Sequence, residues 1–209
     1  MEFIDVIKKR RSIRKYKFKK VPKKDIYEII GIASLAPSGH NKQMCKFLAI
    51  TNHELLKKME KAIIDKLDRI RKWPEAKEME KWFEGRKKLS TFFVNAPVVF
   101  AILTKPYITK MDVLLIQHGI RREEIECIRP YVGIQSVAAA IENLILAATD
   151  KGYGTCWMCA PLIAVDEIHK ILKIENPWRL ISLVPMGIPD QKIGVKTSKK
   201  INEILRFIE

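Results

Sequence analysis

The chain has 209 residues, of which 47% are hydrophobic and 30% are charged, and its formal net charge is +15. We expect a single cytoplasmic domain over residues 1–209, because no apolar run approaches the ~20 residues of a membrane span. The first nine residues include Glu2 and Asp5 and have no continuous apolar region, so no secretory signal is expected. The positive charge would suit a nucleic-acid-binding protein. However, the lysines are spread along the chain among acidic residues and no nucleic-acid-binding motif accompanies them, so we expect neither a nucleic-acid nor a membrane partner.

The first predicted helix begins at Glu2 or Phe3 and ends at a basic cluster. Arg10, Arg11, Ser12 and Arg14 place three guanidinium groups and a hydroxyl within five residues. The planar fork of arginine matches phosphate oxygens two at a time, and a hydroxyl adds a short neutral bond beside it. The cluster therefore predicts a phosphate site, and the alternative is a solvated basic helix end.

The second predicted helix has apolar residues at helical spacing from Ile26 to Ala33 and ends near Leu35. A strand is predicted to begin near Lys46 and to include the apolar run Phe47–Ile50. Between them lies a polar loop of small residues, Pro37–Asn41. Small side chains allow the backbone to approach a ligand closely, so this loop is a candidate binding segment, with an ordinary turn as the alternative.

The middle of the chain alternates between clear and unclear patterns. Residues 53–90 are charged and helix-patterned, and Pro74 predicts a break between two helices. The run from Pro97 to Leu103 is the clearest buried strand. The stretch from Lys105 to Ile128 has a mixed pattern that predicts no particular element.

A long helix is predicted from about Tyr131 to Asp150, apolar on most faces, with Gly152 as its left-handed cap. A helix over residues 165–172 and a strand over residues 180–186 follow. Helices and strands do not alternate regularly, and no glycine-rich phosphate loop follows a strand, so Rossmann and P-loop sites lack their parts. The expected fold class is α+β.

Four motifs, in their order along the chain, resemble those of the nitroreductase family of FMN-dependent oxidoreductases. The resemblance covers almost the whole chain. The motifs are Arg10-Arg11-Ser12-Ile13-Arg14, the segment from Ala36 to Gln43, the run from Lys151 to Trp157 and the run from Pro185 to Pro189. The resemblance implies a central, mostly antiparallel sheet flanked by helices, and an intertwined homodimer with FMN at the subunit interface.

The resemblance also implies the binding residues for FMN. Arg10, Arg11 and Ser12 would contact the phosphate, and Arg14 would lie near the pyrimidine edge, where a cation stabilises charge on the reduced ring. The loop of the other subunit would contribute Pro37, Ser38, Gly39, Asn41 and Gln43. The ring would be lined by Trp157, Met158, Cys159 and Ala160. Lys199 and Lys200 would form a second phosphate contact, with Lys196 as a rival.

The implied reaction uses NADH or NADPH to reduce FMN, which then reduces a small organic acceptor such as a nitroaromatic or quinone. No side chain need act as a catalytic nucleophile, and no metal is expected. Departures from the family pattern at Met44, Cys45, Cys159 and Ala160 put the acceptor in question. The alternatives are a divergent flavin reaction, namely reductive dehalogenation or flavin fragmentation, and a basic nucleic-acid-binding protein.

The pair Cys156 and Cys159 forms a C-x-x-C motif, which alone has low specificity. We expect reduced cysteines in a flavin-lining loop, with a redox or metal role as the alternative. His40 lies in the predicted binding loop, where hydrogen bonding within the loop is the simpler expectation.

Overall fold

A computed structural model describes residues 1–192, 194 and 197–209. Its centre is an antiparallel sheet with the strand order β1-β2-β4-β3. The strands are β1 (Cys45–Ile50), β2 (Val98–Thr104), β3 (Gly154–Thr155) and β4 (Arg179–Gly187). Three of them lie where the sequence predicts strands. The sequence did not predict β3, because two residues are too short to show a periodicity.

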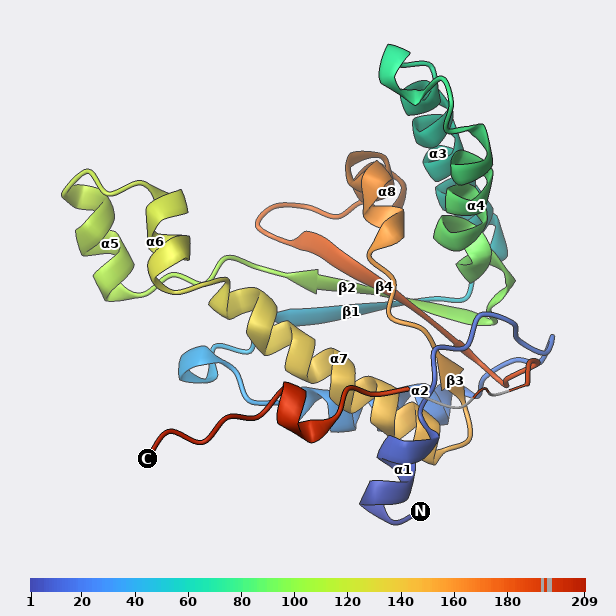
Figure 1. Ribbon diagram of the computed structural model, residues 1–209, viewed down its shortest axis with the longest axis horizontal. Coiled ribbons are helices and arrows are strands. Elements are labelled where there is room, and N and C mark those ends of the chain that lie inside the picture. The colour runs from blue at the N-terminus through green and yellow to red at the C-terminus, as the bar shows by residue number, and fades with distance from the viewer. Residues whose placement is uncertain (193, 195–196) are drawn as a thin grey trace.

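Strand β2 is buried along its whole length because helices cover both faces of the sheet (Figure 1). Its side chains alternate between two separate hydrophobic clusters, as the pleat of a strand requires. One cluster lies against α2 (Lys23–Ser34) and α7 (Val132–Asp150). The other lies against α3 (His53–Arg71), α4 (Glu80–Thr91) and α8 (Val165–Leu172). This arrangement confirms the predicted α+β class with a helix-flanked, mostly antiparallel sheet.

The remaining helices are short. Helix α1 (Phe3–Lys9) opens the chain, and α5 (Lys110–Gln117) and α6 (Arg122–Ile128) form a hairpin in the stretch for which the sequence predicted no element. The break between α3 and α4 contains Pro74, as predicted. Single 3-10 turns include η1 (Gly39–Asn41), η4 (Ala160–Ala164) and η5 (Ile201–Glu203).

Helix α7 is a longer apolar segment than the sequence analysis expected. By length and composition it is the one helix in the described part of the chain that could cross a membrane, although no such segment was expected. Half of that apolar window is buried inside the protein, where Val137, Ile141 and Leu144 pack on the sheet. Packing in the core accounts for its composition. The helix ends before Gly152, whose φ of 82° supplies the predicted left-handed cap.

Candidate functional site

The arginine segment, defined as Arg10–Arg14, lies along strand β3. Ser12 pairs with Thr155, and the Ile13 N–H donates to the Thr155 carbonyl at 2.8 Å. The approach is close enough to require glycine at position 154, since a β-carbon there would lie 2.5 Å from Cγ1 of Ile13. The strand pairing therefore fixes the position of the predicted phosphate-binding residues relative to the Trp157 loop, defined as Thr155–Ala160.

Two residues that the sequence analysis missed hold the backbone of the arginine segment from its other side. The buried Tyr16 hydroxyl donates to the Ile13 carbonyl at 2.5 Å, and burial raises the pKa of this tyrosine, which keeps the hydroxyl protonated as a donor. The side-chain oxygen of Gln191 accepts from the Arg14 N–H at 2.8 Å. Neither residue belongs to a sequence motif: Tyr16 bonds a backbone carbonyl three residues earlier, and the contact of Gln191 depends on tertiary structure.

The three guanidinium groups differ in what they already bind. Arg11 is engaged by the protein itself: Nη1 donates to the Lys8 carbonyl at 2.6 Å and Nε donates to the Gly194 carbonyl at 3.0 Å. Arg10 has a longer contact, 4.0 Å from Nε to the Glu142 carboxylate. Arg14 is exposed, with Nη1 3.5 Å from the Ser12 carbonyl. Arg10 and Arg14 thus keep donors for an anion, while Arg11 ties the C-terminal segment to the site.

The Trp157 loop alternates between buried and exposed side chains. Cys156 and Met158 are buried, whereas Trp157 and Cys159 are exposed and Ala160 is half-buried. The placement of Met158 differs from the expectation that it lines a flavin ring: its side chain packs in the core and its N–H donates to the Leu183 carbonyl at 2.9 Å. The surface of the loop is therefore presented by Trp157, Cys159 and Ala160.

The buried Cys156 thiol lies beside the arginine segment. Burial raises its pKa, while the charges of Arg14 and Arg10 and a hydrogen bond with Ser12 act in the opposite direction. All four cysteines are free thiols. In the part of the chain that the structure describes, no three histidine, cysteine or acidic side chains gather into a group that could hold a metal ion.

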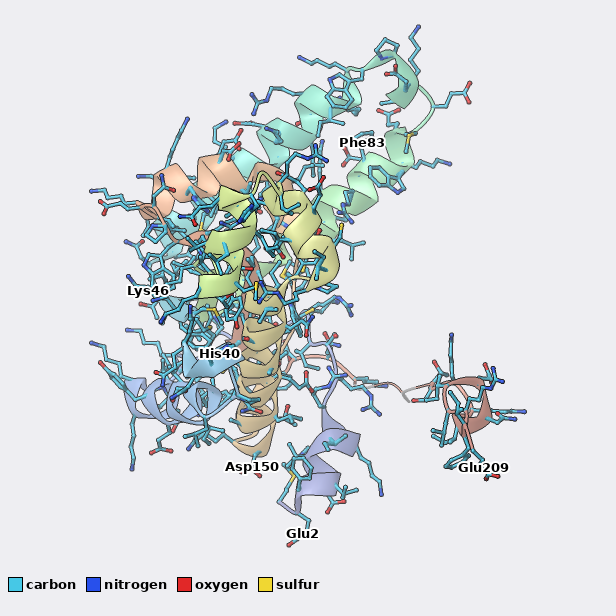
Figure 2. The ribbon with its side chains drawn as sticks, turned by 90° about the vertical axis from the view of Figure 1, so that its left-hand side faces the viewer. Glu2, His40, Lys46, Phe83, Asp150 and Glu209 are labelled. Carbon is cyan, nitrogen blue, oxygen red and sulfur yellow. The ribbon has the colours of Figure 1, made fainter. Side chains whose placement is uncertain are left out.

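The second predicted binding segment is the Ser38 loop, defined as Pro37–Gln43, which lies beside the first turns of α7 (Figure 2). The Gly39 N–H donates to the Ser136 hydroxyl of α7 at 3.2 Å, and the Gln43 N–H donates to the Ser38 hydroxyl at 3.0 Å. Asn41 and Gln43 have positive φ angles of 51° and 46°. The loop is therefore held in a particular, sparsely populated backbone conformation.

The two binding segments contact different parts of α7. Arg10 faces Glu142 and Gly39 faces Ser136, so the contacts lie about 9 Å apart along the axis, on different sides of the helix. Among the described residues, no hydrogen bond or ion pair joins the arginine segment to the Ser38 loop. Within one chain, the structure brings the arginine segment to the Trp157 loop but leaves the Ser38 loop separate.

The predicted second phosphate contact lies in the C-terminal segment. Figure 2 shows this segment, which ends at Glu209, standing apart from the rest of the chain. Lys199 and Lys200 are exposed, and the Lys200 N–H donates to the Glu203 carboxylate at 3.2 Å. Their rival, Lys196, lies outside the described residues.

Comparison with known proteins gives a family and several relatives. The profile of the Nitroreductase family matches residues 7–188. A BluB-like flavoprotein from Clostridium difficile 630 superposes with a TM-score of 0.90 at 31% identity, with 100% of both chains covered. A protein from Archaeoglobus fulgidus with the provisional name NADH dehydrogenase/NAD(P)H nitroreductase is 25% identical, covering 96% of this chain and 94% of its own.

A further solved structure is an oxidised iodotyrosine deiodinase bound to FMN and 3-iodo-L-tyrosine. It superposes with a TM-score of 0.72 at 21% identity and covers 99% of both chains. At this level of identity the likeness concerns the fold.

Proposed function

The chain belongs to the nitroreductase family, and from this premise we propose that it is an FMN-dependent oxidoreductase that reduces a small organic acceptor with NADH or NADPH. The observation that carries the proposal is the arginine segment, where free guanidinium donors and a hydroxyl lie on a rigid backbone beside the exposed Trp157. When bound, FMN supplies the electron-transfer chemistry, and the protein supplies binding, orientation and electrostatics.

The donor set fits a phosphate. Arg10 and Arg14 retain donors, and Ser12 lies between them in the sequence. The Thr155 hydroxyl is buried with no hydrogen-bond partner among the described residues, which leaves one polar group at the same strand pair available to a ligand. We propose that Arg10 and Ser12 bind the FMN phosphate together with Nη2 of Arg11, which the hydrogen bonds of that side chain to Lys8 and Gly194 do not use. Arg14 would stabilise negative charge on the ring, and Trp157 would cover one side of it.

We propose that the site is completed by the Ser38 loop of a second copy of the chain. The separation of the two binding segments within one chain supports this proposal. So does the C-terminal segment, which exposes large apolar side chains that a soluble monomer rarely leaves uncovered. These residues are Ile201, Ile204, Leu205, Phe207 and Ile208. Light scattering on the purified chain should give the mass of a dimer, and a monomer at micromolar concentration would contradict this part of the proposal.

The electron donor and the acceptor are supported by different relatives of the chain. NADH or NADPH as donor is supported by the name of the Archaeoglobus fulgidus relative. A second candidate reaction is reductive dehalogenation. It is favoured by a solved structure of the same fold, an iodotyrosine deiodinase bound to FMN and 3-iodo-L-tyrosine. In both cases the protein would bind FMN in the same way, and the residues around the acceptor would decide the reaction.

Anaerobic reduction of the flavin-loaded protein tests the proposal. We expect NADH or NADPH to bleach the yellow absorbance, and a nitroaromatic or quinone to restore it. If only a chemical reductant bleaches the flavin and an iodinated phenol restores it, the dehalogenase candidate holds instead. A protein that binds no FMN, yet binds DNA with a steep dependence on salt, would overturn both.

Variants of the arginine segment test the assigned binding residues. Arg10→Ala should weaken FMN binding about 10-fold or more, because each charge-assisted bond contributes roughly 1.5–3 kcal/mol. Ser12→Ala should also weaken FMN binding, by a smaller factor. Arg86→Ala is the matched control, since this arginine lies on α4 beside Trp82 and away from the site. Unchanged flavin content in Arg10→Ala would remove the phosphate assignment.

A further inference from the structure

Tyr107 lies between β2 and α5 and contacts the Ser38 loop at three points. Its hydroxyl is 2.6 Å from Nδ1 of His40, and the Lys42 ammonium lies 5.2 Å from the centroid of its ring. Gly39 packs against the ring so closely that a β-carbon there would be 2.9 Å from Cε2. Lys42 also donates to the carbonyl of Ile108, the next residue along the chain. One aromatic side chain thus contacts three residues of the loop, namely Gly39, His40 and Lys42.

The conformation of the loop needs such support. His40, Asn41 and Gln43 are not glycines, yet their φ angles are 51°, 51° and 46°. Left-handed backbone is unfavourable for residues with a β-carbon, and it persists where surrounding contacts determine it. The bond to Ser38 lies within the loop itself, whereas the attachments to Tyr107, to the Ile108 carbonyl and to Ser136 of α7 fix the loop to the rest of the protein.

The other partner of Tyr107 is the α5–α6 hairpin, because Tyr107 lines a small cavity together with Asp112 of α5 and Ile125 of α6. Thr109 and Asp112 form a capping box at the start of α5, and the buried Asp112 is ion-paired with Arg129, which follows α6. The hairpin is therefore closed at its base. Gly39 faces both ends of this base, because a β-carbon there would lie 2.9 Å from Val132, where α7 begins, as well as from Tyr107.

We propose that Tyr107 is a positioning residue that holds the Ser38 loop and the α5–α6 hairpin in one fixed arrangement, with its hydroxyl acting through His40. The consequence for turnover rests on the proposed function, in which the Ser38 loop contacts FMN. A hairpin fixed to that loop is fixed relative to the flavin, so it sets the space in which an acceptor binds. Tyr107 would then act on acceptor binding more than on reduction of the flavin by its donor.

Tyr107→Phe, His40→Ala and the double variant test the proposal, with Tyr27→Phe, an exposed tyrosine of α2, as the matched control. The phenylalanine keeps the ring contacts and removes only the hydroxyl. We expect Tyr107→Phe to raise the KM for the acceptor about 3- to 10-fold, because the variant loses one hydrogen bond. The rate of flavin reduction and the Tm should change little. The double variant should be no worse than the worse single variant, because both remove the same bond.

Hydrogen exchange of residues 38–43 gives a readout that does not depend on flavin. On the full chain without FMN, these amides should exchange several-fold faster in Tyr107→Phe than in the wild type or in Tyr27→Phe. Exchange at the wild-type rate, or additive effects of the two single variants on KM, would overturn the proposal. Because the exchange measurement needs no cofactor, a chain that failed to bind FMN would refute the proposed function and leave this test intact.

Discussion

Gly154→Ala tests whether the arginine segment is fixed by its close approach to β3. A β-carbon at position 154 would lie 2.5, 2.7 and 2.9 Å from three side-chain atoms of Ile13. Ile13 is 2% exposed and has no open space to move into, so the two strands must separate and the 2.8 Å bond from the Ile13 N–H to the Thr155 carbonyl must lengthen. Overpacking costs about 1–3 kcal/mol, and a lost hydrogen bond adds about 1 kcal/mol.

We therefore expect Gly154→Ala to lower the free energy of unfolding by about 2–4 kcal/mol, and to weaken FMN binding because Ser12 shifts with its neighbour. Urea denaturation followed by circular dichroism measures the first effect, and FMN titration measures the second. The matched control is Gly31→Ala in the last turn of α2, where a β-carbon meets nothing within 4 Å. This substitution should stabilise the protein by up to about 0.5–1 kcal/mol. A Gly154→Ala protein as stable as the wild type would refute the reasoning.

Three further predictions follow from buried polar groups. Asp112→Ala should destabilise the α5–α6 hairpin by about 2–3 kcal/mol, because it removes part of a helix cap and the partner of Arg129. Proteolysis between residues 105 and 131 should be faster than in the wild type, and an unchanged rate would contradict this prediction. In native protein a thiol reagent should modify the exposed Cys127 and Cys159 quickly, the half-buried Cys45 more slowly and the buried Cys156 most slowly, whereas equal rates would count against these differences in burial. Burial raises the pKa of Cys45 to about 12, so the unfolded chain loses this thiol proton at a lower pH than the folded chain does. The free energy of unfolding should therefore fall as the pH rises from about 9, and it should fall less steeply in Cys45→Ala.

The regular elements were predictable where one face is buried and the pattern is long enough to show it. Helix α2 and strand β2 follow the expected periods, and Pro74 breaks the helical region where it should. The α5–α6 hairpin was not predictable, because α5 exposes Met111 and Leu114 and buries Asp112, which is the reverse of the usual amphipathic pattern. Its structure depends on a tertiary ion pair rather than on local periodicity.

The candidate site was predictable in its chemistry more than in its geometry. The arginine segment was identified from its residue types and the Trp157 loop from the family resemblance, and the structure places them side by side. Met158 was misplaced because the expectation ignored the two-residue period of an extended segment, in which every second side chain turns inward. Tyr16 and Tyr107 escaped notice because their roles come from contacts with distant parts of the chain or with backbone atoms.

The central claim is that the arginine segment of one chain and the Ser38 loop of its partner hold the same FMN, and a subunit-mixing experiment tests it most directly. One variant is Arg10→Ala, and the other is Asn41→Gly, which removes a side chain without straining the left-handed backbone. Each variant alone should bind FMN weakly. If the site is shared, a mixed dimer combines both defects in one site and leaves the other intact, so flavin titration should recover wild-type affinity in half of its sites. If mixing recovers no wild-type sites, the two segments do not meet across subunits, and the account is contradicted.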